Sequence, residues 1–153
     1  MWFWSESRQF RVFTMKKIIL VENDPAAIDV YREIFQKTDF DVEIAESCEE
    51  MTQELNLIKS GDSTRPDLIL LDMMRPGAGG TKILEQAKKD AKLRGIPVFI
   101  FTNYENPDME KDLQRNNIWP ERYLIKANHT PAELLGIINK YFRAKPKEKT
   151  RLA

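Results

Sequence analysis

Short apolar runs alternate with amphipathic segments along most of this chain, and that alternation is the feature that most restricts its fold. The runs lie at 17–22, 40–46, 67–72, 96–102 and 122–126. Three of them, the first, third and fourth, are almost continuously apolar, which is typical of strands covered on both faces of a parallel sheet. The alternation therefore predicts an α/β domain with a parallel sheet and right-handed crossovers.

Five amphipathic segments separate or follow these runs, and each predicts a helix. They lie at 25–37, 48–60, 81–94, 107–116 and 131–142. Asp24 before Pro25 has the residue types of an N-cap and a first helical position. Thr130 and Glu133 are spaced as a capping box at the start of the last helix.

Composition excludes several classes of protein. The 153 residues carry 24 basic and 24 acidic side chains, so the formal net charge is zero. Zero net charge argues against a general polyanion binder, and we expect no direct contact with nucleic acid. The single cysteine, Cys48, cannot form an internal disulfide or a cysteine-based zinc site. No apolar stretch approaches the roughly 20 residues that cross a bilayer, so we expect a cytoplasmic protein without membrane insertion.

The zero charge is a sum of unlike parts. Residues 1–14 contribute +1 and the segment from 143 onward contributes +4, which leaves −5 for the residues between them. We expect three regions: an N-terminal extension of unassigned structure at 1–14, one domain at 15–143, and a basic flexible tail at 144–153. Charged residues interrupt the aromatic start of the chain, so it is unlike a signal peptide.

Polar side chains stand where the predicted strands end. Glu22 and Asn23 follow the first strand, Asp72 ends the third, Thr102 ends the fourth and Lys126 ends the fifth. Ligands of open parallel sheets bind at the carboxyl ends of the strands, so we expect these side chains to converge. Carboxylate and carbonyl oxygens suit Mg²⁺. A lysine and a hydroxyl beside them would stabilise an anionic oxygen, so the set suits a phosphoryl group on or near a carboxylate.

The sequence resembles the receiver domains of two-component response regulators over residues 16–142. Four segments carry the resemblance in order: IILVENDP, PDLILLDMMRPGAGG, IPVFIFTN and YLIKANHTPAEL. The resemblance implies a flavodoxin-like, doubly wound sheet of five parallel strands in the order 2-1-3-4-5, with five helices. It also implies a regulatory phosphoacceptor that is no enzyme in the ordinary sense.

The resemblance implies a role for individual residues. Asp72 would accept a phosphoryl group from the phosphohistidine of a sensor histidine kinase or a phosphotransfer protein, with Thr102 and Lys126 contacting the phosphoryl oxygens. Tyr123 would be the aromatic switch. The ligands of Mg²⁺ would be Glu22, Asn23, Asp72 and the backbone carbonyl of Met74. The chain would act as a single-domain regulator that signals to a downstream protein through the face formed by 107–116, 122–126 and 131–142.

Two departures from the family pattern leave alternatives open. Asn23 stands where the main metal-binding acid is expected, so Mg²⁺ should bind more weakly; Asp24 could compensate, but a helix cap is its favoured role. Ala127 follows Lys126 where proline is usual, so we expect a trans bond there. The alternative function is a pseudo-receiver, a binding module that works without phosphate. A small phosphatase is a third possibility, which Met74 disfavours because a second acid is common at its position.

Overall fold

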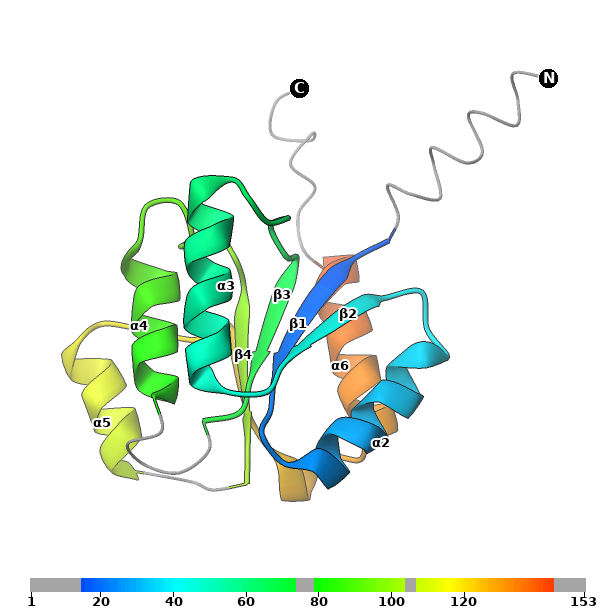
Figure 1. The fold of residues 1–153 in the computed structure, drawn as a ribbon. Coiled ribbons are helices and arrows are strands. Elements are labelled where there is room, and N and C mark those ends of the chain that lie inside the picture. Colours follow the sequence, from blue (N-terminus) through cyan, green and yellow to red (C-terminus); the bar gives the residue numbers. More distant parts are fainter. Residues whose placement is uncertain (1–14, 74–78, 104–106, 145–153) are drawn as a thin grey trace.

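The computed structural model describes residues 15–73, 79–103 and 107–144, and it has five strands and five α-helices there (Figure 1). The strands are β1 (Lys17–Val21), β2 (Asp41–Ala45), β3 (Leu68–Leu71), β4 (Val98–Thr102) and β5 (Arg122–Ile125). The helices are α2 (Pro25–Gln36), α3 (Cys48–Ser60), α4 (Gly80–Lys89), α5 (Pro107–Arg115) and α6 (Pro131–Ala144), with a short 3₁₀ helix η1 (Lys126–Asn128) after β5.

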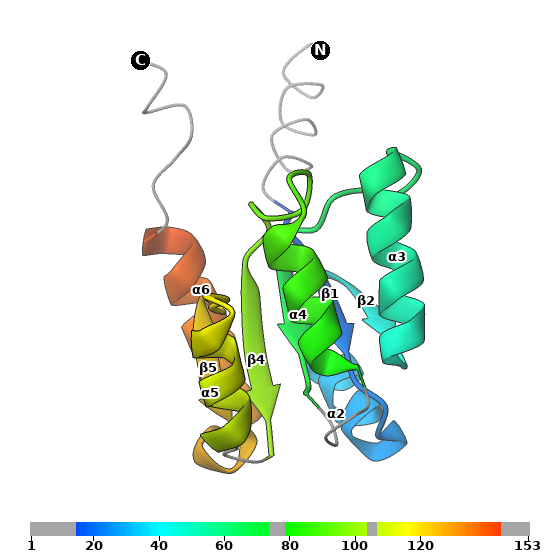
Figure 2. The same ribbon diagram turned by 90° about the vertical axis from the view of Figure 1, so that its left-hand side faces the viewer.

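All neighbouring strands are parallel, and their order in the sheet is β2-β1-β3-β4-β5. Helices α2 and α6 cover one face of the sheet, and α3, α4 and α5 cover the other (Figures 1 and 2). This arrangement confirms the predicted flavodoxin-like, doubly wound fold. None of the described helices is long and apolar enough to cross a membrane.

Burial on both faces explains the continuous apolar runs. In β1, Ile19 and Val21 pack into the core under α3 and α4, whereas Ile18 and Leu20 pack into the core under α2 and α6. Successive strand side chains point to opposite faces, so a central strand needs apolar residues at every position. Strand β2 lies at the edge of the sheet, and there Asp41 and Glu43 are exposed.

Both predicted N-terminal caps are present. Asp24 accepts a hydrogen bond from the Ala26 amide at 3.2 Å and so caps α2. At the start of α6 the Glu133 amide donates to the Thr130 hydroxyl at 3.1 Å, and the Thr130 amide donates to the Glu133 carboxylate at 3.0 Å. This reciprocal pair is a capping box, and it fixes where α6 begins after η1.

Most elements end within one residue of the predicted position, and α4 differs the most. The helix expected over 81–94 ends at Lys89, because Asp90 is extended and its carboxylate accepts the Lys92 amide at 2.8 Å. Leu93, in the turn that follows, is buried in the core under α3, α4 and α5. The strand expected over 122–126 ends at Ile125, and Lys126 begins η1. The described residues contain no cis peptide bond, in agreement with the expected trans bond before Ala127.

Gly79 is the N-cap residue of α4, and its backbone conformation restricts which residue can replace it. Its φ of +102° lies in the left-handed region, and an added Cβ would lie 3.1 Å from the Cβ of Cys48. We expect Gly79→Ala to lower the free energy of unfolding by about 1–2 kcal/mol. Gly136→Ala is the matched control, because Gly136 lies in α6 and an added Cβ meets nothing within 4 Å.

Alanine at position 136 should raise the free energy of unfolding by about 0.5–1 kcal/mol, since alanine favours helix over glycine. Urea denaturation of the two variants measures both effects. Equal effects of the two substitutions would contradict the constraint at Gly79.

Candidate functional site

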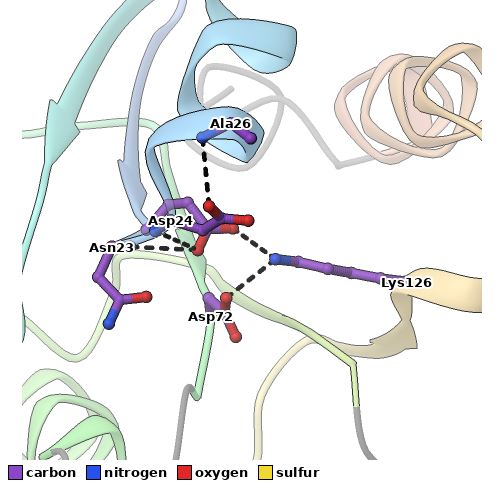
Figure 3. Close-up of polar contacts among 6 residues, drawn as sticks. Asn23, Asp24, Ala26, Asp72 and Lys126 are labelled. Carbon is purple, nitrogen blue, oxygen red and sulfur yellow. Dashed lines mark hydrogen bonds and ion pairs between the residues drawn. The ribbon is translucent and has the colours of Figure 1, made fainter.

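Lys126 lies between two carboxylates at the carboxyl end of the sheet (Figure 3). Its ammonium group donates a hydrogen bond to Asp72 Oδ2 at 2.9 Å and a second, short one to Glu22 Oε1. Both contacts are also ion pairs. The three residues are far apart in sequence, with 54 positions between Asp72 and Lys126 and 104 between Glu22 and Lys126. The structure thus brings together three of the predicted site residues.

The sheet determines where each of the three side chains stands. Glu22 directly follows β1, and its amide donates to the Ala45 carbonyl of β2 at 3.0 Å. Asp72 directly follows β3, and its amide donates to the Val21 carbonyl of β1 at 3.1 Å. Backbone bonds to neighbouring strands therefore fix both acids. Lys126 enters from the end of β5, and its ammonium lies 5.7 Å from the centre of the Phe101 ring in β4.

Glu22 is a deeply buried acid, with only 1% of its side chain exposed. Its Oε2 accepts hydrogen bonds from the amides of Asn23 at 3.1 Å and Asp24 at 3.3 Å. Burial raises the pKa of the Glu22 carboxyl, the neighbouring Asp72 raises it further, and Lys126 acts in the opposite direction. The environment therefore disfavours the ionised form of Glu22 despite the ion pair.

Lys126 remains a cation between these two acids. Burial by itself disfavours the charged ammonium, but the hydrogen bonds to Glu22 and Asp72 outweigh burial and raise the pKa of Lys126. The ammonium is thus held in its charged form. One cation serves two buried acids, so the formal charge of this group of three is −1 when both acids are ionised.

Asn23 and Asp24 are both exposed and do not join the ion pairs. Asn23 contributes its backbone amide to Glu22, and in Figure 3 its side chain lies on the opposite side of Asp72 from Lys126. Asp24 uses Oδ1 to cap α2. The helix cap is therefore the role that the structure gives to Asp24.

Two other predicted residues, Thr102 and Tyr123, lie on the neighbouring strands β4 and β5. Thr102 is the last residue of β4, is 1% exposed, and pairs in register with Ile125, the residue before Lys126. Tyr123 lies in β5 beside Ile100 of β4 and packs against the core under α3, α4 and α5. Met74, predicted to offer a carbonyl to the metal, lies outside the described residues.

Two further residues lie near the acids and were not predicted to do so. Tyr31 of α2 is buried and packs edge-on against Phe101, with ring centres 5.9 Å apart. Burial raises the pKa of Tyr31, and Lys126, Glu22 and Asp72 all act on its hydroxyl. Its place on the apolar stripe of α2 indicated a core residue, and nothing in that pattern indicated proximity to the site.

Cys48 begins α3, and its side chain lies close to Gly79, the N-cap residue of α4. Burial raises the pKa of the Cys48 thiol, and the charge of Asp72 raises it further. Cys48 and Tyr31 both stay neutral near pH 7 as a result. A thiol held neutral is a poor nucleophile and a poor metal ligand.

The ligand atoms available at the site are of the type that binds a hard divalent cation. Carboxylate and amide oxygens are suitable ligands for Mg²⁺, and Glu22, Asp72 and Asn23 would provide them. The net negative charge offered to a metal is small, however, because Lys126 already pairs with both carboxylates. The described part of the chain contains no group of three or more acidic, histidine or cysteine side chains placed to hold a metal.

The chain is similar in sequence to a known protein family and to several of its members. The model of the response regulator receiver domain matches residues 18–139. The probable methanogenesis regulatory protein FilR2 of Methanothrix harundinacea is 29% identical over 111 residues, which cover 71% of this chain and 70% of FilR2. Response regulator Rcp1 of Synechocystis is 31% identical over 96 residues, which cover 61% of this chain and 65% of Rcp1.

Two solved structures are similar over most of their length. The phosphorylated cyanobacterial phytochrome response regulator RcpA has a TM-score of 0.70 and 26% identity, covering 88% of this chain and 98% of RcpA. The Mn²⁺-bound form of Rcp1 has a TM-score of 0.71 and 25% identity, covering 86% of this chain and 97% of Rcp1. One of these relatives thus carries phosphate and the other a divalent metal.

The raised pKa of Glu22 gives a prediction about stability and pH. A raised pKa means that the folded state binds the proton more tightly, so ionising Glu22 costs stability as the pH rises through the folded pKa. Glu22→Gln removes that cost and leaves Lys126 paired with Asp72. We expect this variant to be more stable than wild type at pH 7, with an advantage that disappears below about pH 4.5, the usual range of a glutamate.

Glu133→Gln is the control of opposite sign. Hydrogen bonds from the backbone amide and the hydroxyl of Thr130 lower the pKa of Glu133, so its ionised form contributes stability that is lost as the pH falls. This variant should be less stable than wild type at pH 7 and equal to it near pH 3. Urea unfolding across this pH range measures both. If Glu22→Gln were less stable than wild type at pH 7, the inferred excess of negative charge around Glu22, Asp72 and Lys126 would be contradicted.

Proposed function

This chain belongs to the family of response regulator receiver domains, and we propose that it accepts a phosphoryl group on Asp72 and signals through contacts with a downstream protein. The observation that carries the proposal is the pairing of Asp72 with Lys126. A buried carboxylate with a fixed ammonium 2.9 Å from one oxygen combines a nucleophile with a counter-charge for the incoming group.

The transfer requires a donor with a phosphorylated histidine, so the upstream partner is a sensor histidine kinase or a phosphotransfer protein. A carboxylate oxygen of Asp72 forms a bond to phosphorus as the bond between phosphorus and the donor's imidazole nitrogen breaks. The imidazole leaves with the electron pair of that bond and takes up a proton. Catalysis of this step is mostly positioning and electrostatic stabilisation, which Lys126 and the Thr102 hydroxyl provide toward the phosphoryl oxygens.

A divalent cation belongs to this proposal. Glu22, Asn23, Asp72 and the carbonyl of Met74 would hold Mg²⁺, which neutralises negative charge on the phosphoryl oxygens when bound. The carboxylate oxygens of Glu22 and Asp72 are suitable ligands for Mg²⁺, which supports this assignment. The neutral side chain of Asn23 indicates that Mg²⁺ binds weakly. The Mn²⁺-bound form of Rcp1 supports a metal in this family.

Phosphorylation would shift an existing equilibrium between two forms of the face made by α5, β5 and α6. Thr102 and Tyr123 lie on adjacent strands leading to that face and would respond to the phosphoryl group. Support comes from the weak attachment of α5, in which only Leu113 is buried. A helix with so little buried surface can move at low cost, and its movement would change the surface offered to the downstream protein.

Asn23 favours a second candidate, a pseudo-receiver that binds its partner without phosphate. An amide at this position brings no charge to a metal, and Asp24 is occupied as a helix cap. A chain that cannot bind Mg²⁺ would keep the fold and the output face and lose phosphoryl transfer. The experiment below separates the two candidates.

Phosphorylation can be measured directly by intact-mass spectrometry after incubation with acetyl phosphate and Mg²⁺. We expect wild type to gain the mass of one phosphoryl group and Asp72→Asn to gain none. Asp39→Asn is the matched control, because Asp39 is exposed on the turn after α2 and should not alter labelling. Failure of wild type to gain mass, under conditions that label another receiver domain, would support the pseudo-receiver.

A further inference from the structure

Positive charge gathers at the amino end of the sheet, the end opposite Asp72. Each helix runs back from the carboxyl end of the strands toward their amino end (Figures 1 and 2). The amino end is therefore formed by the starts of the strands, the last turns of the helices and the loops between them. Six described segments make it up, and we call them together the basic end: 15–17, 37–41, 59–67, 88–97, 115–122 and 140–144.

The charge of the chain is divided between its two ends. The basic end carries 13 basic and 6 acidic side chains, a net charge of +7, whereas the other described residues carry 4 basic and 15 acidic side chains, a net charge of −11. Helices α3, α5 and α6 contribute to this division, because each has an acid in its first turn and a lysine or arginine in its last. The formal net charge of zero therefore does not exclude an anionic partner for the basic end.

Ion pairs use only part of the positive charge at the basic end. Lys88 pairs with Glu121 at 2.5 Å, and Lys59 pairs with Asp90 at 2.8 Å. The ion pairs between described residues involve none of five exposed cations at this end: Lys37, Lys92, Arg94, Lys140 and Arg143. These five side chains are therefore accessible to an anionic surface.

Exposed apolar side chains lie at the same end. Trp119, at 53%, and Met15, at 52%, are the two most exposed large apolar residues of the described chain. Met15 precedes β1 and Trp119 precedes β5, so β3 and β4 lie between them in the sheet. In the sequence, the residues before Met15 include Trp2 and Trp4. Apolar side chains spread across a charged end suit a broad surface better than a groove.

We propose that the basic end binds the surface of a membrane that contains anionic lipids. The negative potential of such a surface attracts lysine and arginine, and tryptophan favours the boundary between lipid and water. Peripheral binding is stable when charge and apolar contact act together, and the basic end has both. The sequence after Ala144 adds four basic side chains and one acid at 145–153.

The protein would bind the membrane end-on, with the carboxyl end of the sheet facing away from lipid. Asp72 and Lys126 lie at that far end, so they would remain open to a phosphoryl donor. The inference goes beyond the proposed function and does not rest on it.

Co-sedimentation of the full chain with lipid vesicles tests the proposal. We expect the chain to bind vesicles of phosphatidylcholine and phosphatidylglycerol about tenfold or more tightly than vesicles of phosphatidylcholine alone. Added salt should weaken binding to the anionic vesicles, because it screens exposed charges. No binding to the anionic vesicles, or equal binding to both kinds, would overturn the proposal.

Charge variants separate the position of the charge from its total. Lys140→Glu combined with Arg143→Glu should weaken binding to the anionic vesicles about tenfold or more, because both side chains are exposed at the basic end. Lys82→Glu combined with Lys111→Glu is the matched control. It changes the net charge equally, but these exposed lysines lie outside the basic end, in α4 and α5.

The control should stay within about threefold of wild type, and equal losses in the two double variants would overturn the assignment to one end. Lys140→Gln combined with Arg143→Gln adds no acid at the end of α6, and it should lose affinity in the same direction by a smaller factor. Circular dichroism checks the fold of each variant. Unchanged binding by a folded Lys140→Gln, Arg143→Gln variant would also contradict the proposal.

The apolar contact is tested by Trp119→Ser, which should weaken binding to the anionic vesicles about fivefold or more. Val30→Ser is its control, because Val30 is 46% exposed in α2, outside the basic end. Equal effects of the two substitutions would overturn the role of Trp119.

Fluorescence anisotropy with a labelled DNA duplex tests nucleic acid as the competing partner. We expect no binding at protein concentrations that saturate the anionic vesicles. Comparable affinity for the duplex, lost in the Lys140→Glu, Arg143→Glu variant, would overturn the assignment to lipid and make the basic end a nucleic-acid surface. None of these variants alters Asp72, so the vesicle results stand whether or not Asp72 accepts a phosphoryl group.

Discussion

One ammonium group shared by two buried carboxylates determines the arrangement at the carboxyl end of this sheet. Ions removed from water need close partners, and here the partners come from the ends of β1, β3 and β5. Strands β3 and β5 are separated by β4, which places them about 10 Å apart. A lysine has the length to cross the end of β4, and it does so past Phe101. The side chain of Lys126 is therefore long enough to reach the acids from its place in the strand order.

The sequence predicted the fold and the acidic group for identifiable reasons. Central strands buried on both faces need unbroken apolar runs, so their ends are marked by the first polar residues, Glu22 and Asp72. Parallel strands place such residues at one edge, which made their meeting with Lys126 predictable. Tyr31 was not predictable, because its position on an apolar stripe is the same for any core residue. The early end of α4 depends on a turn at Asp90 that helical periodicity does not register.

The charges near Asn23 explain why a neutral residue is favourable at this position. Burial already disfavours the ionised form of Glu22, and a third carboxylate here would add repulsion. Asp24 keeps its carboxylate one residue further on, where it caps α2 in contact with solvent. The two acids therefore carry little surplus negative charge, because Lys126 pairs with both of them. Such a group of charges suits the proposed phosphorylation of Asp72, which would add the strongest negative charge at the site.

The most direct test of this arrangement is NMR observation of the Lys126 ammonium in ¹⁵N-labelled protein at neutral pH. An ammonium held between Glu22 and Asp72 should exchange its protons with water slowly enough to give a separate signal. That signal should shift when either Glu22→Gln or Asp72→Asn is introduced. A Lys126 ammonium that exchanges as fast as the exposed lysines, or whose signal neither substitution moves, would contradict the central role of this ion group.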